Sequence, residues 1–132
     1  MIVVDTNVVA YLLIDGDATA AAEKVRAADS DWALPALWRS EFRNVLALYV
    51  RTDQLKLHDA VAVMSAAEKL FTGGEYPVES QGVLELATSS GCSAYDAEFA
   101  WLADRLGVPL VTADKKLLRA FPGLAVNVED YA

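Results

Sequence analysis

Short apolar runs alternate with longer amphipathic segments along the whole chain, and this alternation is the feature that most restricts its fold. The short runs have the character of strands, and the segments between them have the period of helices. Strands that alternate with helices form βαβ units, so we expect an α/β fold with a central, mostly parallel five-stranded sheet and helices on both faces. The predicted strands are Ile2 to Val4, Trp32 to Leu34, Tyr76 to Val78, Leu110 to Thr112 and Ala125 to Val128. The predicted helices are Thr19 to Ala28, Leu37 to Val50, Leu57 to Phe71, Glu79 to Ser90, Tyr95 to Leu106 and Lys115 to Ala120.

The length and composition suit one globular domain over residues 1–132. The chain is 55% hydrophobic and 23% charged, which is enough apolar material for a core without disulfides. Its single Cys92 has no partner for an internal disulfide, which favours a reducing compartment. We see no signal peptide and no apolar run near the roughly 18 to 20 residues of a membrane span. We therefore expect a cytoplasmic protein with no membrane association.

The formal net charge of −8 argues against a broad basic surface for nucleic acid. It leaves nucleic acid open as a ligand, because acids that bind divalent cations carry part of that charge. The basic residues are also unevenly distributed. They gather in two segments, one with Arg39, Arg43 and Arg51 and the other with Lys115, Lys116 and Arg119.

Two acids come shortly after predicted strands. Asp5 comes after the first strand, and Asp114 follows Thr112 at the end of a later one. Ligands of parallel sheets bind beyond the carboxyl ends of the strands, where the strand order reverses, so both acids are candidate site residues. Each has a second interpretation as a helix N-cap, and Thr112 is an alternative cap that would leave Asp114 free.

Asp96 begins a predicted helix, three residues after Ser93. This spacing is that of a capping box, which is one interpretation of the acid. On a helical projection, however, Asp96 shares a face with two alanines and tends inward, whereas we expect Glu98 and Arg105 to point to solvent.

Glu41 is the acid that no cap explains. It lies well inside a predicted helix, on a face that also carries Leu37, Val45 and Leu48. A carboxylate in an apolar face has a desolvation cost unless a cation or hydrogen bonds compensate it. The alternative to a site residue is a core glutamate paired with another side chain, for which Arg51 is the candidate.

Four such acids at one edge of a sheet would repel one another and raise each other's pKa unless cations lie between them. Oxygen ligands alone suit hard ions such as Mg²⁺ or Mn²⁺. One or two such ions activate a water and neutralise a phosphodiester, so the acids indicate phosphodiester hydrolysis.

The same residues resemble a known family. The resemblance is to the PIN domain, and more closely to the VapC toxins of prokaryotic toxin–antitoxin pairs. It extends over nearly the whole chain and includes the segment LADRLGVPLVTADKKL. The motifs that carry it are Asp5-Thr6-Asn7, Glu41 in RSEFRNVL, Tyr95-Asp96-Ala97 and Thr112-Ala113-Asp114.

The resemblance implies a three-layer α/β/α sandwich with a central parallel sheet, and an endoribonuclease that needs Mg²⁺ or Mn²⁺. It also implies a homodimer, and an antitoxin partner whose tail blocks the site. Carried over by position, the catalytic and metal-binding acids are Asp5, Glu41, Asp96 and Asp114. The polar residues that support them are Thr6, Asn7 and Thr112.

Four basic residues are candidates for holding RNA phosphates, because such contacts position a backbone without reading its sequence. Lys115 and Lys116 are favoured by their place beside Asp114, with Arg39 and Arg43 as further candidates. The competing interpretation for each of the four is a solvated helix face.

Two other classes of protein compete with the nuclease. One is a catalytically silent protein that keeps the fold, the metal and a partner. The other is an acidic-pocket phosphoacceptor or aspartyl phosphatase, which lacks its own requirements here: Asn7 stands where a phosphatase needs an acid, and Glu79 follows the third strand where a receiver needs Asp.

Overall fold

A five-stranded sheet crosses the protein, and every neighbouring pair of its strands is parallel. The computed structural model describes residues 1–132. The strand order is β3-β2-β1-β4-β5, which confirms the predicted α/β architecture. The strands are β1 (Ile2–Val4), β2 (Trp32–Pro35), β3 (Glu75–Tyr76), β4 (Leu110–Thr112) and β5 (Ala125–Asn127).

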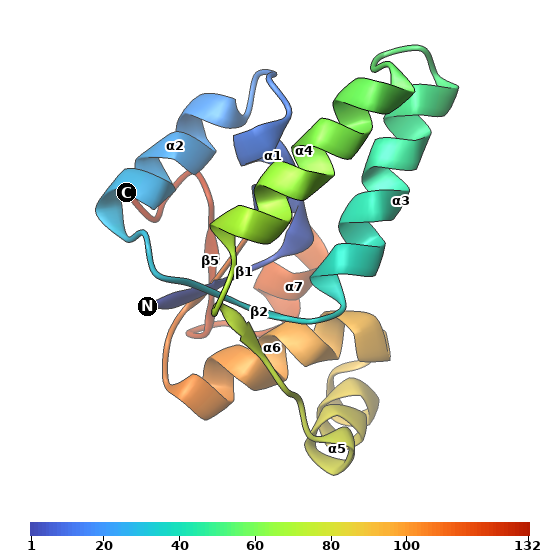
Figure 1. Ribbon diagram of the computed structural model, residues 1–132. Helices are drawn as coiled ribbons and strands as arrows, with labels where there is room; N and C mark the ends of the chain where they lie inside the picture. Colours follow the sequence, from blue (N-terminus) through green and yellow to red (C-terminus); the bar gives the residue numbers. More distant parts are fainter.

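Seven helices connect and cover the strands. Figure 1 shows α1 to α4 on one side of the sheet and α5 and α6 on the other, so the layers are those of an α/β/α sandwich. No helix is long and apolar enough to cross a membrane. The helices are α1 (Thr6–Leu13), α2 (Thr19–Ala28), α3 (Trp38–Arg51), α4 (Leu57–Leu70), α5 (Ser80–Ser90), α6 (Ala94–Leu106) and α7 (Lys115–Ala120).

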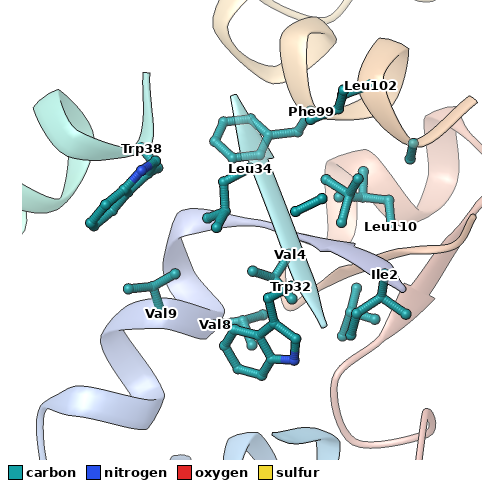
Figure 2. Packing of buried hydrophobic residues seen from close by; sticks show 14 of the residues in the cluster. Ile2, Val4, Val8, Val9, Trp32, Leu34, Trp38, Phe99, Leu102 and Leu110 are labelled. Carbon is teal, nitrogen blue, oxygen red and sulfur yellow. The ribbon is translucent and has the colours of Figure 1, made fainter. Parts of the chain in front are cut away.

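The core forms on both faces of the sheet because its central strands are apolar throughout. Every residue of β1, β2 and β4 is buried, as expected for parallel strands with helices on each side. Figure 2 shows Phe99 and Leu102 of α6 on one side of β1, and Val8 and Val9 of α1 on the other. These side chains belong to one hydrophobic cluster of 26 buried residues, which fixes the strand ends that carry the site.

The edge strand β3 differs from its predicted range. It is confined to Glu75–Tyr76, whereas the apolar run predicted a strand from Tyr76 to Val78. Pro77 has no backbone N–H to donate to a ladder, so the strand ends before it. At the opposite edge, β5 ends at Asn127 and not at Val128.

The order of the strands reverses between β1 and β4. From β1 the chain proceeds outward to β2 and β3, and from β4 it proceeds the other way to β5. Val4 of β1 lies opposite Val111 of β4, so the next residues, Asp5 just after β1 and Thr112 at the end of β4, lie side by side. This is the switch point at which parallel sheets bind ligands.

Candidate active site

Asp5 is the most buried acid of the protein, and its carboxylate is held at three points. The side chain leaves β1 at the switch point and is only 8% exposed. Oδ1 accepts from the backbone N–H of Thr6 at 2.8 Å, so Asp5 is the N-cap of α1. Oδ2 accepts from the hydroxyl of Thr112 at 2.8 Å and from the amide of Asn7 at 3.3 Å. The cap and the site residue are therefore one carboxylate, with its orientation fixed by β4 as well as α1.

Asn7 joins the same two segments a second time. Its amide nitrogen donates to Asp5, and its carbonyl oxygen accepts from the backbone N–H of Ala113 at 3.4 Å. Thr6, Asn7 and Thr112, which the resemblance gives as supporting residues, thus all contact the acids directly.

Glu41 reaches the site from α3. Its Oε1 accepts from the hydroxyl of Thr6 at 2.7 Å, which ties this helix to the start of α1. The predicted alternative of a pair with Arg51 is wrong, because Arg51 is exposed near the end of α3 and lines the groove between α3 and α4. Burial raises the pKa of Glu41, and the nearby charge of Asp5 adds to this rise.

Asp96 lies in the first turn of α6, where Ser93 is the N-cap. The Ser93 hydroxyl accepts from the backbone N–H of Asp96 at 3.0 Å, which confirms half of the predicted capping box. The carboxylate itself is half-buried, and burial followed by the charge of Asp114 raises its pKa. Lys116 is close enough to oppose this rise. The prediction that Asp96 tends inward is confirmed.

Asp114 and Thr112 share the start of α7. Asp114 caps the helix by accepting from the backbone N–H of Lys116 at 2.8 Å. Its own N–H donates to the Thr112 hydroxyl at 3.0 Å, and that hydroxyl donates onward to Asp5. Thr112 therefore links two of the acids by a chain of hydrogen bonds.

The four acids lie close enough to repel one another. Burial raises the pKa of Asp5 from 3.8 to about 6, and the charges of Asp96 and Asp114 push in the same direction. Asp5 and Asp96 in turn raise the pKa of Glu41. The ion pairs of the protein involve other acids, namely Asp29, Asp59, Glu68 and Glu75. The site thus concentrates negative charge, which hydroxyl and amide donors and the nearby Lys116 compensate only in part.

The donor set fits a hard divalent cation. Every acid offers carboxylate oxygen, and no His or Cys is among them. As the side chains lie, no group of three or more of them closes around a common point in the way a dedicated metal cage does. Mg²⁺ suits such a site, because it keeps several waters and is held in proteins by one or two carboxylates. The side chains that could contribute to holding such an ion are Asp5, Glu41, Asp96 and Asp114.

Glu98 is a fifth acid, which the helical projection of the sequence assigned to solvent. That expectation was wrong for Glu98 and correct for Arg105. Glu98 is only partly exposed, burial raises its pKa, and its charge reaches Glu41. A projection of α6 alone gives no sign of this, because the second helix that brings Glu41 close is distant in sequence.

The predicted RNA contacts divide into two groups. Lys115 and Lys116 are exposed at the start of α7, and Lys116 lies within electrostatic range of Asp96. Arg39 instead forms two ion pairs. Its pair with Glu68 joins α3 to α4, and its pair with Glu75 joins α3 to the edge strand β3.

Arg43 lies elsewhere. It lines the groove between α3 and α4. Two residues after Glu41 on the same helix, it projects from the other side of α3. The structure therefore brings Lys116 near Asp96, with Lys115 next to it in α7, and brings neither arginine to the acids.

Fold and site together define an α/β protein with a carboxylate-rich site at the switch point of a parallel sheet. Residues 2–122 match the PIN domain, and the chain belongs to that family. Ribonuclease VapC3 of Pyrobaculum aerophilum is 25% identical over 126 residues, which are 93% of this chain and 96% of that protein.

Two solved structures share the fold. PAE2754 from Pyrobaculum aerophilum superposes with a TM-score of 0.71 at 27% identity, over 96% of this chain and 90% of that one. FitAB bound to an IR36 DNA fragment superposes with a TM-score of 0.73 at 21% identity, over 100% and 98% of the two chains, and at that identity it supports the fold alone.

Proposed function

We propose that this protein is a divalent-metal-dependent endoribonuclease, the VapC-type toxin of a toxin–antitoxin pair, with its active site at Asp5, Glu41, Asp96 and Asp114. The observation that carries the proposal is the buried Asp5 carboxylate, which is surrounded by three further acids and has no cationic partner. A protein keeps such a cluster at a cost to its stability, so the cluster needs a function. The similarity to ribonuclease VapC3 supports RNA as the substrate class.

The acids would hold Mg²⁺ or Mn²⁺, which when bound supplies an activated water and neutralises charge on the phosphodiester. The chain's own contribution is positioning. Thr6 and Thr112 hold the Asp5 carboxylate in one orientation, and Thr6 also holds Glu41. Asn7 and Ser93 fix the segments around them. Catalytic groups held in this way require little rearrangement when the substrate arrives.

We assign contacts with the RNA backbone near the cut to Lys115 and Lys116. Both are exposed at the N-terminal end of α7, next to Asp114. Lysine contacts to phosphate add affinity without reading sequence, so these residues would increase binding to any RNA. Arg39 is left out of the proposed contacts, because its guanidinium is already paired with two glutamates.

Cleavage of a structured RNA pool with Mg²⁺ or Mn²⁺ tests this function. We expect the wild-type protein to cut RNA, and cutting to stop with EDTA and in Asp96→Asn. The matched control is Asp104→Asn, a change of the same kind at an exposed position of the same helix, which should cut like the wild type. A protein that binds the metal and leaves RNA intact would instead be the catalytically silent, partner-binding alternative.

The toxin role requires a protein partner, and the surface offers apolar area for one. Leu57 and Val61 of α4 are 69% and 58% exposed and line the groove between α3 and α4, and Leu48 of α3 is 51% exposed. Exposed apolar residues beside a groove, such as Leu57 and Val61, are typical of interaction surfaces. We infer a cognate antitoxin and a homodimer as the partners. Expression should arrest growth of a bacterial host for the wild type and not for Asp96→Asn, and sedimentation of the purified protein would report the dimer.

A further inference from the structure

A second pocket opens beside the acids, between α1, α3 and the loop that joins α1 to α2. Its volume is about 410 Å³, which is within the range of pockets that hold small ligands. Asn7 lines the pocket and donates to Asp5 at 3.3 Å, so one residue separates the pocket from the candidate active site. A ligand in this pocket would therefore be a neighbour of any group bound at Asp5.

The walls of the pocket include two aromatic side chains. Tyr11 comes from α1 and Tyr49 from α3, and both are half-buried. The aromatic residues that pack against one another, Trp32, Trp38, Phe42 and Phe71, form a separate group in the core. Tyrosine rings at a pocket surface are platforms on which unpaired bases stack.

The outer wall of the pocket is acidic. Asp15 and Asp17 line it from the loop, and no lysine or arginine does. Thr19 keeps this loop in shape, because its hydroxyl accepts from the N–H of Gly16 at 3.0 Å and donates to the carbonyl of Ile14 at 3.2 Å. The wall is thus largely formed before any ligand binds.

This charge decides which part of an RNA fits. Two carboxylates without a cation repel a phosphate group, so the pocket does not suit the RNA backbone. Carboxylates accept hydrogen bonds from the N–H groups of bases. Guanine presents two adjacent N–H donors on its Watson–Crick edge, whereas uracil flanks its single N–H with two carbonyl acceptors that a carboxylate repels.

We propose that the pocket of Tyr11, Asp15, Asp17 and Tyr49 receives an unpaired guanine of the RNA, next to the phosphodiester at the acidic site. This inference rests on the proposed function, since it assigns a base to the substrate of that site. The pocket would then set where the enzyme cuts, while Lys115 and Lys116 hold the backbone without regard to sequence.

The first test follows binding alone, in EDTA, with the nucleosides guanosine and uridine as probes. We expect guanosine to shift the amide NMR signals of residues 11–19 and 49, and uridine to shift them about tenfold less at equal concentration. The double change Asp15→Asn with Asp17→Asn should remove this preference, Tyr49→Leu should weaken binding, and Tyr49→Phe should restore it. Equal shifts with both nucleosides, or none in this region, would overturn the proposal even if the protein cuts RNA.

The second test maps cut sites in a randomised RNA pool. We expect guanine to be enriched within two nucleotides of the cut for the wild type and for Asp104→Asn, and the enrichment to fall about tenfold in the double variant. A wild-type protein that cuts RNA with no such enrichment contradicts the guanine pocket and leaves the nuclease in place. If the double variant keeps the cut sites and loses binding of a protein partner, the pocket belongs to that partner and the proposal falls.

Discussion

Asp5 combines two tasks that the sequence presents as alternatives. Its backbone position makes it the cap of α1, and its second carboxylate oxygen is turned toward Thr112 and the other acids. Capping alone would leave the carboxylate near solvent, where its charge is inexpensive. Here the Asp5 side chain is only 8% exposed, so ionising its carboxylate costs free energy in the folded state. The stability of the fold and the binding of a cation at the site therefore both depend on whether Asp5 is ionised.

This coupling predicts how stability depends on pH in the metal-free protein. The pKa of Asp5 is about 6 in the folded state against 3.8 as its ordinary value, so the folded protein binds this proton more tightly than the unfolded one. Its contribution to stability is full below pH 3.8 and is lost as the pH rises through 6, and a shift of about two units corresponds to on the order of 3 kcal/mol. In urea unfolding with EDTA, the wild type should lose stability relative to Asp5→Asn between pH 4.5 and 7.5. A constant difference between the two proteins over that range would mean that Asp5 ionises normally.

Thr112 is the donor whose loss should affect the site most. Thr112→Val keeps the shape of the side chain and removes the hydroxyl that links Asp5 to Asp114. We expect RNA cleavage near pH 6.5 to fall at least about tenfold, because a lost hydrogen bond to a charged group is worth about 1.5–3 kcal/mol. The loss should be smaller at pH 8, where Asp5 is ionised even without this donor. Thr112→Ser retains the hydroxyl and should cut like the wild type, and equal losses in both variants would exclude the hydroxyl as the cause.

Replacing Arg39 and replacing Lys116 should have opposite effects on stability and on RNA binding. Arg39→Ala breaks two half-exposed ion pairs and should lower the free energy of unfolding by about 1 kcal/mol with little effect on RNA binding. Lys116→Ala should leave stability nearly unchanged and weaken RNA binding, with a shallower dependence on salt. Measuring both variants by urea unfolding and by RNA binding at two salt concentrations separates the roles. The reverse result would move the RNA contact to α3.

At the scale of elements, the position of the site follows from two short strands. β1 and β4 have three residues each, yet their pairing sets Asp5 beside Thr112, and α3 and α6 then bring Glu41 and Asp96 from other parts of the chain. The apolar runs and the alternation with helices are local signals, so the sheet could be predicted from them. The partner of Glu41 could not, because the contact with Thr6 joins residues 35 positions apart. The proximity of Glu98 to Glu41 could not be predicted for the same reason, because the two residues are far apart in the sequence.

The helices α5 and α6 approach closely at one glycine. A Cβ placed on Gly82 of α5 would collide with the indole ring of Trp101 on α6. Gly82→Ala should therefore destabilise the protein by about 1–3 kcal/mol, because the ring has to move within a packed interface. Thermal unfolding measures this, with Gly16→Ala as the control, since a Cβ on Gly16 meets nothing within 4 Å. Equal stability of Gly82→Ala and the wild type would show that the two helices are packed more loosely.

On the scale of the whole molecule, the negative charge of the protein opposes the binding of RNA, which is the expected substrate. The protein carries a formal net charge of −8, and much of its function as proposed depends on acids gathered at one edge of the sheet. RNA is itself an anion, so a protein of this kind needs a cation at the acids before a phosphodiester can approach them. Under the proposed function, the metal would therefore admit the substrate as well as supply chemistry for the cut.

A titration with Mn²⁺ followed by electron paramagnetic resonance tests this most directly, because free and bound Mn²⁺ give different signals and no RNA is needed. We expect the wild type and Asp104→Asn to bind Mn²⁺ at pH 7.5, and Asp5→Asn and Asp96→Asn to bind it at least about tenfold more weakly. Binding by the wild type should also weaken as the pH falls through 6, because protons then compete with Mn²⁺ for Asp5. Wild-type protein that leaves the Mn²⁺ free, or binding that is the same in all four proteins, would contradict a metal site at these acids.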